Sequence, residues 1–433
     1  MKKIDVFDGD TLHRQCPPDK ESNVRCRFFG VGADGGQLTA PFTDDTLGKH
    51  LLFLGGIGTG KTNALFQVVR QIRQSLTPSD IVVIFDTKGD FYREFYRQGD
   101  IVISNDDKAA GDTDADYWNI IGEIERGEHE EESIIEIARN LFKEKIEKSS
   151  QPFFPNAAKD LFSALLIHAV RNGEITSNHA LRQLLDACEI TEMQRILACH
   201  QDLRAMTSYV SDARSPQTQG VLSELQQMSR EIFIGNFRKK GTLSMRDLVR
   251  EKGGKAVFIE YDLGIGNALT PVYRLLFDLG IKEALSRLKS EGNVWFVADE
   301  FRLLPHLQHM EDAVNFGRSL GVKFLIGIQN VEQIYDSYGE SRAKSIMSGF
   351  LTNIIFRVND HASREYARNL FGKNRKLEIY SSALQSKGIT EEVRDAYVVE
   401  DWDITNLKTG EAIIGMPGKE PFVFKFKQYA NKA

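Results

Sequence analysis

Short apolar runs that end at a glycine or an acidic residue alternate with helical patterns along this chain. The first run spans residues 51–54 and ends at Gly55, and the second spans residues 81–85 and ends at Asp86. Between the two runs, an apolar stripe repeats at the spacing of one helix face: Leu65, Val68, Val69 and Ile72. The order strand, glycine-rich turn, helix and strand predicts a βαβ unit of a parallel sheet.

Similar apolar runs return in the second half of the chain, with helical stretches between them. They occupy residues 256–259, 294–298, 324–328 and 353–356. Each run is short and strongly apolar, which is typical of a strand buried on both faces. The chain is therefore predicted to be an α/β protein with a mainly parallel central sheet.

Residues 174–232 interrupt this sheet pattern, because they contain helical stretches and no β-branched runs. Ser177 precedes one helical stretch, Thr191 and Gln194 form a capping-box pattern that opens another, and Pro216 precedes a third. We therefore expect an inserted all-α domain at 174–232.

The composition is that of an ordinary globular protein, with 41% hydrophobic and 27% charged residues among 433. The formal net charge is −6, whereas a protein whose whole surface grips nucleic acid is usually basic. Two local basic clusters, at 237–240 and 373–376, could still track phosphates, although each also fits a solvated loop.

Neither the cysteines nor the apolar segments indicate an extracellular or membrane-spanning protein. The four cysteines show no CxxC pair and no zinc spacing, so free thiols in a reducing compartment are expected: Cys16, Cys26, Cys188 and Cys199. No charge-free apolar stretch reaches about 18 residues. The sequence predicts a cytoplasmic protein, which a partner could recruit to the inner face of the membrane.

Residues 55–62 read Gly-Gly-Ile-Gly-Thr-Gly-Lys-Thr and fit the P-loop pattern G-x-x-x-x-G-K-T. Glycines allow the backbone N–H groups to point inward at phosphates, and the following helix presents its positive N-terminus to the same anion. Lys61 is expected to reach the β- and γ-phosphates of ATP, and Thr62 is expected to bind Mg²⁺. The predicted cofactor-binding residues are Gly55, Gly56, Ile57, Gly58, Thr59, Gly60, Lys61, Thr62 and Asn63.

Two further strand ends supply polar groups suited to ATP hydrolysis. The run at 294–298 delivers Asp299 and Glu300, of which Asp299 is expected to support Mg²⁺ and Glu300 to polarise the attacking water. The run at 324–328 delivers Gln329, whose amide could sense the γ-phosphate. The pair of carboxylates favours hydrolysis over phosphate transfer to another substrate.

An arginine that acts on a neighbouring subunit's nucleotide is harder to place. Such a residue stabilises charge on the transferred phosphoryl group and can raise the rate by roughly 10³–10⁵. Arg318, just before the run at 324–328, is the first candidate. The alternatives are Arg357, Arg364 and Arg368.

The order of these motifs resembles one family, the type IV secretion and conjugation coupling proteins of the TraD/TraG type, in the HerA/FtsK superfamily of DNA-translocating ATPases. The resemblance covers roughly 45–425. It rests on the P-loop, on Phe85–Asp90, on Ala298–Phe301 and on Gly327–Asn330. Thr87 stands where the family has a proline. Weaker similarities lie at Tyr117–Asn119, Phe153–Ala158 and Ile354–Asp360.

The resemblance implies a RecA-like P-loop NTPase that acts as a hexameric ring and moves DNA without sequence preference. It divides the chain into an irregular or β-rich N-terminal segment at 1–45, a motor domain at 46–173 and 233–433, and the inserted domain. Within the motor domain, Asn156 is predicted to cap an amphipathic helix. Relaxase, secretion-channel or membrane proteins are the implied partners. Family members usually begin with two membrane-spanning helices, which this sequence does not show.

Two other functions remain open at this point. A HerA-like motor for DNA end processing or phage defence would use the same ATP site with a nuclease partner. A nucleotide-switched adaptor that recruits substrates would hydrolyse ATP slowly and would not respond to DNA.

Overall fold

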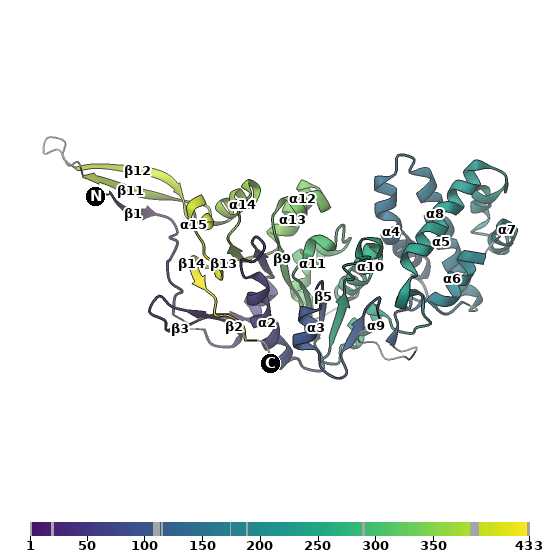
Figure 1. The fold of residues 1–433 in the computed structure, drawn as a ribbon, viewed down its shortest axis with the longest axis horizontal. Coiled ribbons are helices and arrows are strands. Elements are labelled where there is room, and N and C mark those ends of the chain that lie inside the picture. The colour runs from purple at the N-terminus through teal and green to yellow at the C-terminus, as the bar shows by residue number, and fades with distance from the viewer. Residues whose placement is uncertain are drawn as a thin grey trace.

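The computed structural model describes residues 2–18, 21–106, 113, 116–173, 175–187, 189–287, 291–381 and 389–430. The strands of its central sheet are β4 (Leu51–Leu54), β5 (Ile81–Asp86), β6 (Ile101–Ile103), β7 (Ala256–Glu260), β8 (Val294–Ala298), β9 (Val322–Ile328), β10 (Thr352–Phe356), β13 (Glu411–Met416) and β14 (Lys419–Lys425). Within the described residues their order is β14-β13-β10-β4-β9-β8-β5-β7-β6 (Figure 1). The strands from β10 to β6 are parallel, and β13 and β14 add an antiparallel hairpin at one edge.

The predicted fold class is confirmed. All six predicted apolar runs are strands of this sheet, and their bounds agree with the structure within two residues. The sequence did not predict β6, β13 or β14. Alternate residues of a strand face opposite sides, so Leu52 and Leu54 join one core while Leu51 and Phe53 join the other.

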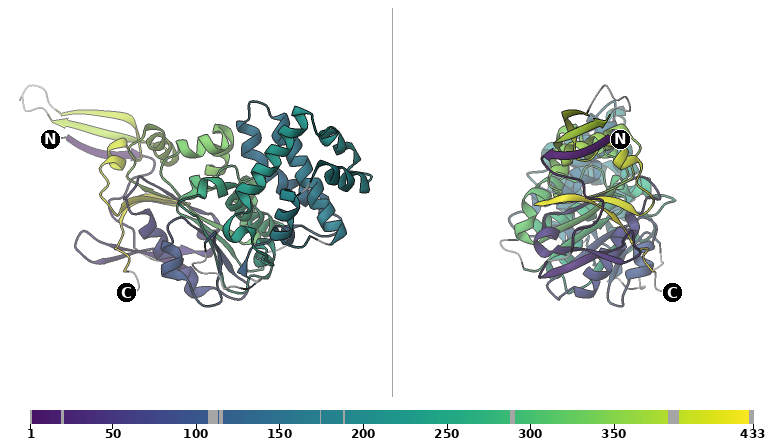
Figure 2. Two further views of the ribbon diagram at one scale, coloured as in Figure 1. Left: turned by 45° about the vertical axis from the view of Figure 1, so that its right-hand side comes forward. Right: turned by 90° about the vertical axis from the view of Figure 1, so that its left-hand side faces the viewer.

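Helices cover both faces of the sheet (Figure 2). One face packs on α2 (Lys61–Ser75), α3 (Asp90–Phe95) and the two-stranded sheet of β2 (Val24–Val31) and β3 (Gln37–Thr43). The other face packs on α10 (Gly266–Leu285), α11 (Met310–Phe316), α12 (Glu332–Tyr338), α13 (Glu340–Ser348) and α14 (His361–Phe371). Short elements complete the connections: α1 (Asp44–Gly48), η2 (Ile120–Glu123), η4 (Gly235–Arg238), α9 (Met245–Glu251), η5 (Phe301–Leu303), η6 (Gly317–Leu320) and α15 (Asp401–Thr405).

A helical lobe projects from the end of the sheet that carries β6 and β7 (Figure 1). Its elements are α4 (Glu130–Lys148), α5 (Phe153–Asn172), α6 (Asn178–Ala187), α7 (Ile190–Cys199), η3 (Arg204–Val210) and α8 (Pro216–Ile232). An all-α insertion is thus confirmed. In the structure α5 packs on both α4 and α8, so these earlier helices are part of the same lobe. The boundaries of the insertion at 174 and 232 stay a prediction.

Two predicted helix starts are wrong. Asn156 does not cap a helix, because α5 begins at Phe153 and the Asn156 amide donates to the Pro152 carbonyl, 2.8 Å away, within the first turn. The earlier start lets the ring of Phe154 pack against Gly220, where an added Cβ would lie 2.6 Å from that ring. Thr191 likewise lies inside α7, which begins one residue earlier after Glu189.

The root of the helical lobe is fixed by the aromatic-asparagine motif at 117–119. The indole Nε1 of Trp118 donates to Glu123 at 2.8 Å, and the backbone N–H of Met245 donates to the same carboxylate at 2.6 Å. The Asn119 amide donates to the Thr176 carbonyl at 2.8 Å. Burial raises the pKa of the Glu123 carboxyl, although the hydrogen bonds oppose this effect. The motif therefore joins the two chain connections of the lobe to each other.

The N-terminus contributes to a separate, three-stranded sheet that projects at the opposite end of the molecule (Figure 1). It consists of β1 (Lys2–Asp8), β11 (Lys373–Ser381) and β12 (Ile389–Tyr397) in the order β1-β11-β12. The basic cluster 373–376, for which a loop had been one expectation, begins β11. Its charges are partly paired, since Lys376 lies 3.5 Å from Glu400 and Arg375 lies 3.5 Å from Asp395.

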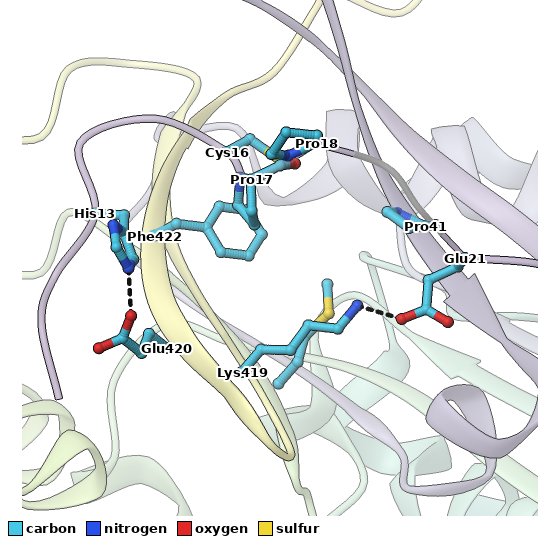
Figure 3. Close-up of a pocket in the computed structure, with 10 residues that line it drawn as sticks. His13, Cys16, Pro17, Pro18, Glu21, Pro41, Lys419, Glu420 and Phe422 are labelled. Carbon is cyan, nitrogen blue, oxygen red and sulfur yellow. Dashed lines mark hydrogen bonds and ion pairs between the residues drawn. The ribbon is translucent and has the colours of Figure 1, made fainter.

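Ion pairs fasten the following N-terminal stretch to the β13–β14 hairpin (Figure 3). His13 contacts Glu420 at 2.5 Å, and Lys419 contacts Glu21 at 2.7 Å. The two pairs border a cavity of about 290 Å³, which Phe422 and Cys16 also line. Cys16, Cys26 and Cys199 are free thiols, as expected, and Cys188 lies outside the described residues.

Candidate nucleotide site

The register of the parallel strands brings the predicted site residues together at the carboxyl ends of the central strands. Ala298 of β8 lies opposite Ile326 of β9, and Ile328 of β9 lies opposite Leu54 of β4. The carboxyl ends of these strands are therefore adjacent, and the segments that follow them meet there. Open parallel sheets bind their ligands at this kind of edge.

The P-loop wraps tightly because its glycines allow contacts and backbone angles that other residues do not. A Cβ at Gly55 would lie 2.5 Å from Phe356, and Gly60 has a φ of 116°. The Gly410 N–H donates to the Thr59 carbonyl at 2.9 Å and so holds the loop from the β13 side. Nothing in the sequence pattern pointed to Gly410.

Lys61 begins α2 and folds back over the loop. Its ammonium donates to the carbonyls of Gly55, at 2.5 Å, and of Gly56, at 3.1 Å. The side chain is buried, and burial lowers the pKa of this amine, while the carboxylates of Asp299 and Glu300 raise it. The ammonium thus lies between the loop and the two acids.

Thr62 and Asp299 form the candidate Mg²⁺ site. The Thr62 hydroxyl donates to one oxygen of Asp299 at 2.5 Å. The other oxygen, Oδ1, is buried and has no hydrogen-bond partner among the described residues. Burial raises the pKa of Asp299, opposed by the Thr62 hydrogen bond and by Lys61. A Cβ at Gly327 would lie 2.4 Å from the Asp299 carbonyl oxygen, so only glycine fits beside this acid.

This pair of residues fits Mg²⁺ bound together with phosphates. Mg²⁺ is usually held in nucleotide sites by one or two protein oxygens, water and phosphate oxygens. Among the residues that the structure describes, no group of three or more His, Cys, Asp or Glu could hold a metal ion by itself. An unpartnered buried carboxylate oxygen beside a threonine hydroxyl matches the partial ligand set of a nucleotide site.

Glu300 is held in place by two neighbours. The Gln329 amide donates to both carboxylate oxygens, at 2.8 and 2.9 Å, and Arg302 donates to one of them at 3.0 Å. Gln329 therefore links the end of β9 to the acid that follows β8. The sequence did not single out Arg302, because its position two residues after Glu300 resembles any surface arginine.

Comparison with known proteins identifies the family. The family model described as "Type IV secretion-system coupling protein DNA-binding domain" matches residues 36–424. The chain belongs to the type IV coupling-protein family. The resemblance inferred from the ordered motifs is thereby confirmed.

Curated coupling proteins are similar in sequence over much of this chain. The coupling protein TraD of Escherichia coli (strain K12) is 22% identical over 414 residues, which cover 90% of this chain and 54% of TraD. VirD4 of Bartonella quintana (strain Toulouse) is 21% identical over 338 residues, which cover 73% of this chain and 51% of VirD4. The chain thus spans about half the length of these curated relatives.

Solved structures of a coupling protein share the fold. The unbound conjugative coupling protein TrwBdeltaN70 superposes with a TM-score of 0.75 at 20% identity, over 93% of this chain and 90% of that chain. TrwB in complex with ADP and Mg²⁺ gives a TM-score of 0.72 at 19% identity, over 100% of this chain and 97% of that chain. VirB4 of Thermoanaerobacter pseudethanolicus is more distant, with a TM-score of 0.59, 14% identity and 96% and 98% of the two chains covered.

Two of the predicted cofactor-binding residues have side chains that face the C-terminal segment or solvent. Both ends of the Asn63 amide bond to the C-terminal segment, through the Lys427 carbonyl at 3.1 Å and the Tyr429 N–H at 2.6 Å. Ile57 points outward and is 84% exposed. Direct contact of these two side chains with a nucleotide stays a prediction.

None of the four candidate arginines, all within the described residues, makes a side-chain hydrogen bond or ion pair to this chain's own P-loop. Arg318 precedes β9 and therefore lies near the amino end of that strand, whereas Gln329 follows its carboxyl end. The Arg318 side chain is exposed and paired with Asp45. Arg364 and Arg368 contact Asp401, at 3.8 and 3.0 Å. Arg357 touches the P-loop only through its carbonyl, which accepts from Gly56 N–H at 3.0 Å.

The described helices give no membrane span. None of them combines the length with the low charge that crossing a bilayer requires.

Proposed function

We propose that this chain is an ATP-hydrolysing motor that moves DNA, as nucleoprotein substrate, into a conjugative type IV secretion channel. The observation that carries this proposal is the set of side chains at one sheet edge: Lys61 in the loop, Thr62 bonded to Asp299, and Glu300 bonded to Gln329. Membership of the coupling-protein family supports the DNA substrate.

ATP and Mg²⁺ are the proposed cofactors. TrwB, which shares the fold, has been solved with ADP and Mg²⁺ and with non-hydrolysable analogues of ATP and GTP. In this chain the P-loop amides and Lys61 would hold the phosphates, and Thr62 and Asp299 would hold Mg²⁺. The ion would neutralise phosphate charge when bound. Glu300 would orient and polarise the attacking water, because Gln329 and Arg302 fix its carboxylate at the same edge.

The active form is proposed to be a ring, most simply a hexamer. None of the candidate arginines makes a side-chain hydrogen bond or ion pair to its own P-loop, and exposed Arg318 could complete the site of the next subunit. Relaxase, secretion-channel or membrane proteins would be the partners. The chain would work at the cytoplasmic face of the membrane, recruited there by one of them.

The test is steady-state ATP hydrolysis by purified protein across a range of protein concentrations, with and without single- and double-stranded DNA. Turnover that rises steeply with protein concentration and is stimulated by DNA is the expected result. Slow turnover that neither DNA nor concentration changes would contradict the motor and favour the adaptor. DNA-stimulated turnover that depends on a nuclease partner would favour the HerA-like alternative.

A further inference from the structure

Lys88 lies at the same ends of the parallel strands as the candidate nucleotide site, just after β5, the strand that pairs with β8. Phe85 of β5 is directly opposite Ala298 of β8, so Asp86 and Asp299 leave the sheet side by side. Adjacent strands are about 4.8 Å apart. Lys88 follows Asp86 by two residues and therefore comes off the sheet beside Asp299 and Glu300.

The backbone around Lys88 is fixed. Its N–H donates to Asp86 Oδ1 at 3.3 Å, and its carbonyl accepts from Arg93 at 3.2 Å. Gly89, with a φ of 69°, then turns the chain into α3. The position of the Lys88 backbone is thus set by the fold.

The ammonium of Lys88, in contrast, has no partner. The residue is exposed, and within the described part of the chain its side chain makes no hydrogen bond and no ion pair. The neighbouring cations differ: Arg302 contacts Glu300 at 3.0 Å, and Lys61 bonds to the loop carbonyls. Arg93 is paired with Asp90. Lys88 is therefore a positive charge at this edge that no internal structural contact explains.

The charge of Lys88 affects the pKa values of two site residues, Asp299 and Lys61. The pKa of Asp299 is raised mainly by burial, and Lys88 is among the groups that lower it. The pKa of Lys61 is lowered mainly by burial, and Lys88 lowers it further. Lys88 is thus near enough to add to the field across the region between the P-loop and the two acids.

We propose that Lys88 is a further catalytic residue, whose ammonium contacts the terminal phosphate of ATP from the β5 side. This inference rests on the proposed ATPase function. In hydrolysis the water oxygen bonds to phosphorus and gives a proton to Glu300, while the bond from phosphorus to the bridging oxygen breaks and ADP leaves. Negative charge spreads over the phosphoryl oxygens as this happens. Glu300 places its own negative charge beside that group. Lys88 offsets this repulsion.

The test compares the binding of ADP with that of a non-hydrolysable ATP analogue, each with Mg²⁺, by isothermal titration. The variants are Lys88→Gln, which removes the charge, and Lys88→Arg, which keeps it. Lys344→Gln is the matched control, because Lys344 is an exposed lysine on α13 that pairs with Glu340.

For Lys88→Gln we expect an affinity for the ATP analogue that is lower by about tenfold or more, because a charge-assisted hydrogen bond is lost. The affinity for ADP should stay the same. Lys88→Arg should recover most of the difference, and Lys344→Gln should match the wild type. In turnover, kcat of Lys88→Gln should fall by about 10².

An unchanged ratio of the two affinities in Lys88→Gln would overturn the role of Lys88 while leaving the ATPase proposal intact. An equal loss of affinity for both nucleotides would also overturn it, because that result would indicate a general structural effect. A wild-type protein that binds neither nucleotide would overturn the proposed function itself.

Discussion

Replacing Glu300 by Gln tests the assignment of the attacking water to this carboxylate. The side chain keeps its length and one acceptor oxygen, so the Gln329 amide, now 2.8 and 2.9 Å from the two oxygens, retains one of its two contacts. The change removes only the negative charge and the capacity to take a proton. ATP should still bind, because the hydrogen bonds of Glu300 go to Gln329 and Arg302 and none goes to the P-loop residues that would hold the phosphates.

The expected losses in stability and in rate differ greatly. The Glu300 side chain is 17% exposed and its arginine partner Arg302 is 48% exposed, so the lost ion pair is screened by water. We expect the free energy of unfolding to fall by about 1 kcal/mol. Loss of general-base assistance should lower kcat by about 10²–10⁴, or about 3–5 kcal/mol in the activation barrier.

Two assays separate the effects. Steady-state hydrolysis gives kcat, and titration with a fluorescent ATP analogue gives affinity. Low kcat with an affinity close to that of the wild type would agree with the assignment. Turnover within about threefold of the wild type would remove Glu300 from this role, because a tenfold effect requires only about 1.4 kcal/mol.

Three other changes should have distinct results. Lys61→Ala should abolish both nucleotide binding and hydrolysis, since it removes the ammonium beside the loop; unchanged ATP affinity in a titration would contradict the phosphate role. Gly327→Ala places a methyl group 2.4 Å from the Asp299 carbonyl oxygen. It should lower the free energy of unfolding by about 1–3 kcal/mol and raise the Mg²⁺ concentration needed for turnover. An unaltered Mg²⁺ dependence would argue against Asp299 as a metal ligand. Burial lowers the pKa of His50 to about 4, so protonation at lower pH favours the unfolded chain, and the stability present above pH 6.5 is lost as the pH falls toward 4. Between pH 7 and pH 5 the free energy of unfolding should fall by about 2 kcal/mol more in the wild type than in His50→Asn, as measured by urea denaturation, and equal pH dependence in both would refute this.

The sheet was predictable because its central strands are buried on both faces. Runs such as 51–54 and 294–298 must be apolar at every position, which makes them visible in the sequence. The strands that were missed lack this property: β6 has three residues, and β14 begins and ends with exposed polar residues. The strands β1 and β11 are paired across more than 360 positions, and no local pattern encodes such a pairing.

Helix starts were less predictable than helices. A polar residue such as Asn156 or Thr191 fits the capping pattern, but the chain begins α5 and α7 earlier. In α5 the packing of Phe154 outweighs the preference of one side chain for the cap. Tertiary contacts therefore decide the boundary, while the apolar stripe decides that a helix forms.

The sequence by itself determined the chemical content of the site: the P-loop, the acid pair after one strand and the glutamine after another. Their spacing is local, because each motif is bound to the end of its own strand. Only the tertiary structure decided which of these groups touch. Strand order and register place Glu300 on Gln329 and Thr62 on Asp299, turn Asn63 toward the C-terminal segment, and leave Lys88 unpaired beside the acids. Contacts between distant segments depend on how the whole chain buries its apolar surface, so no single motif determines them.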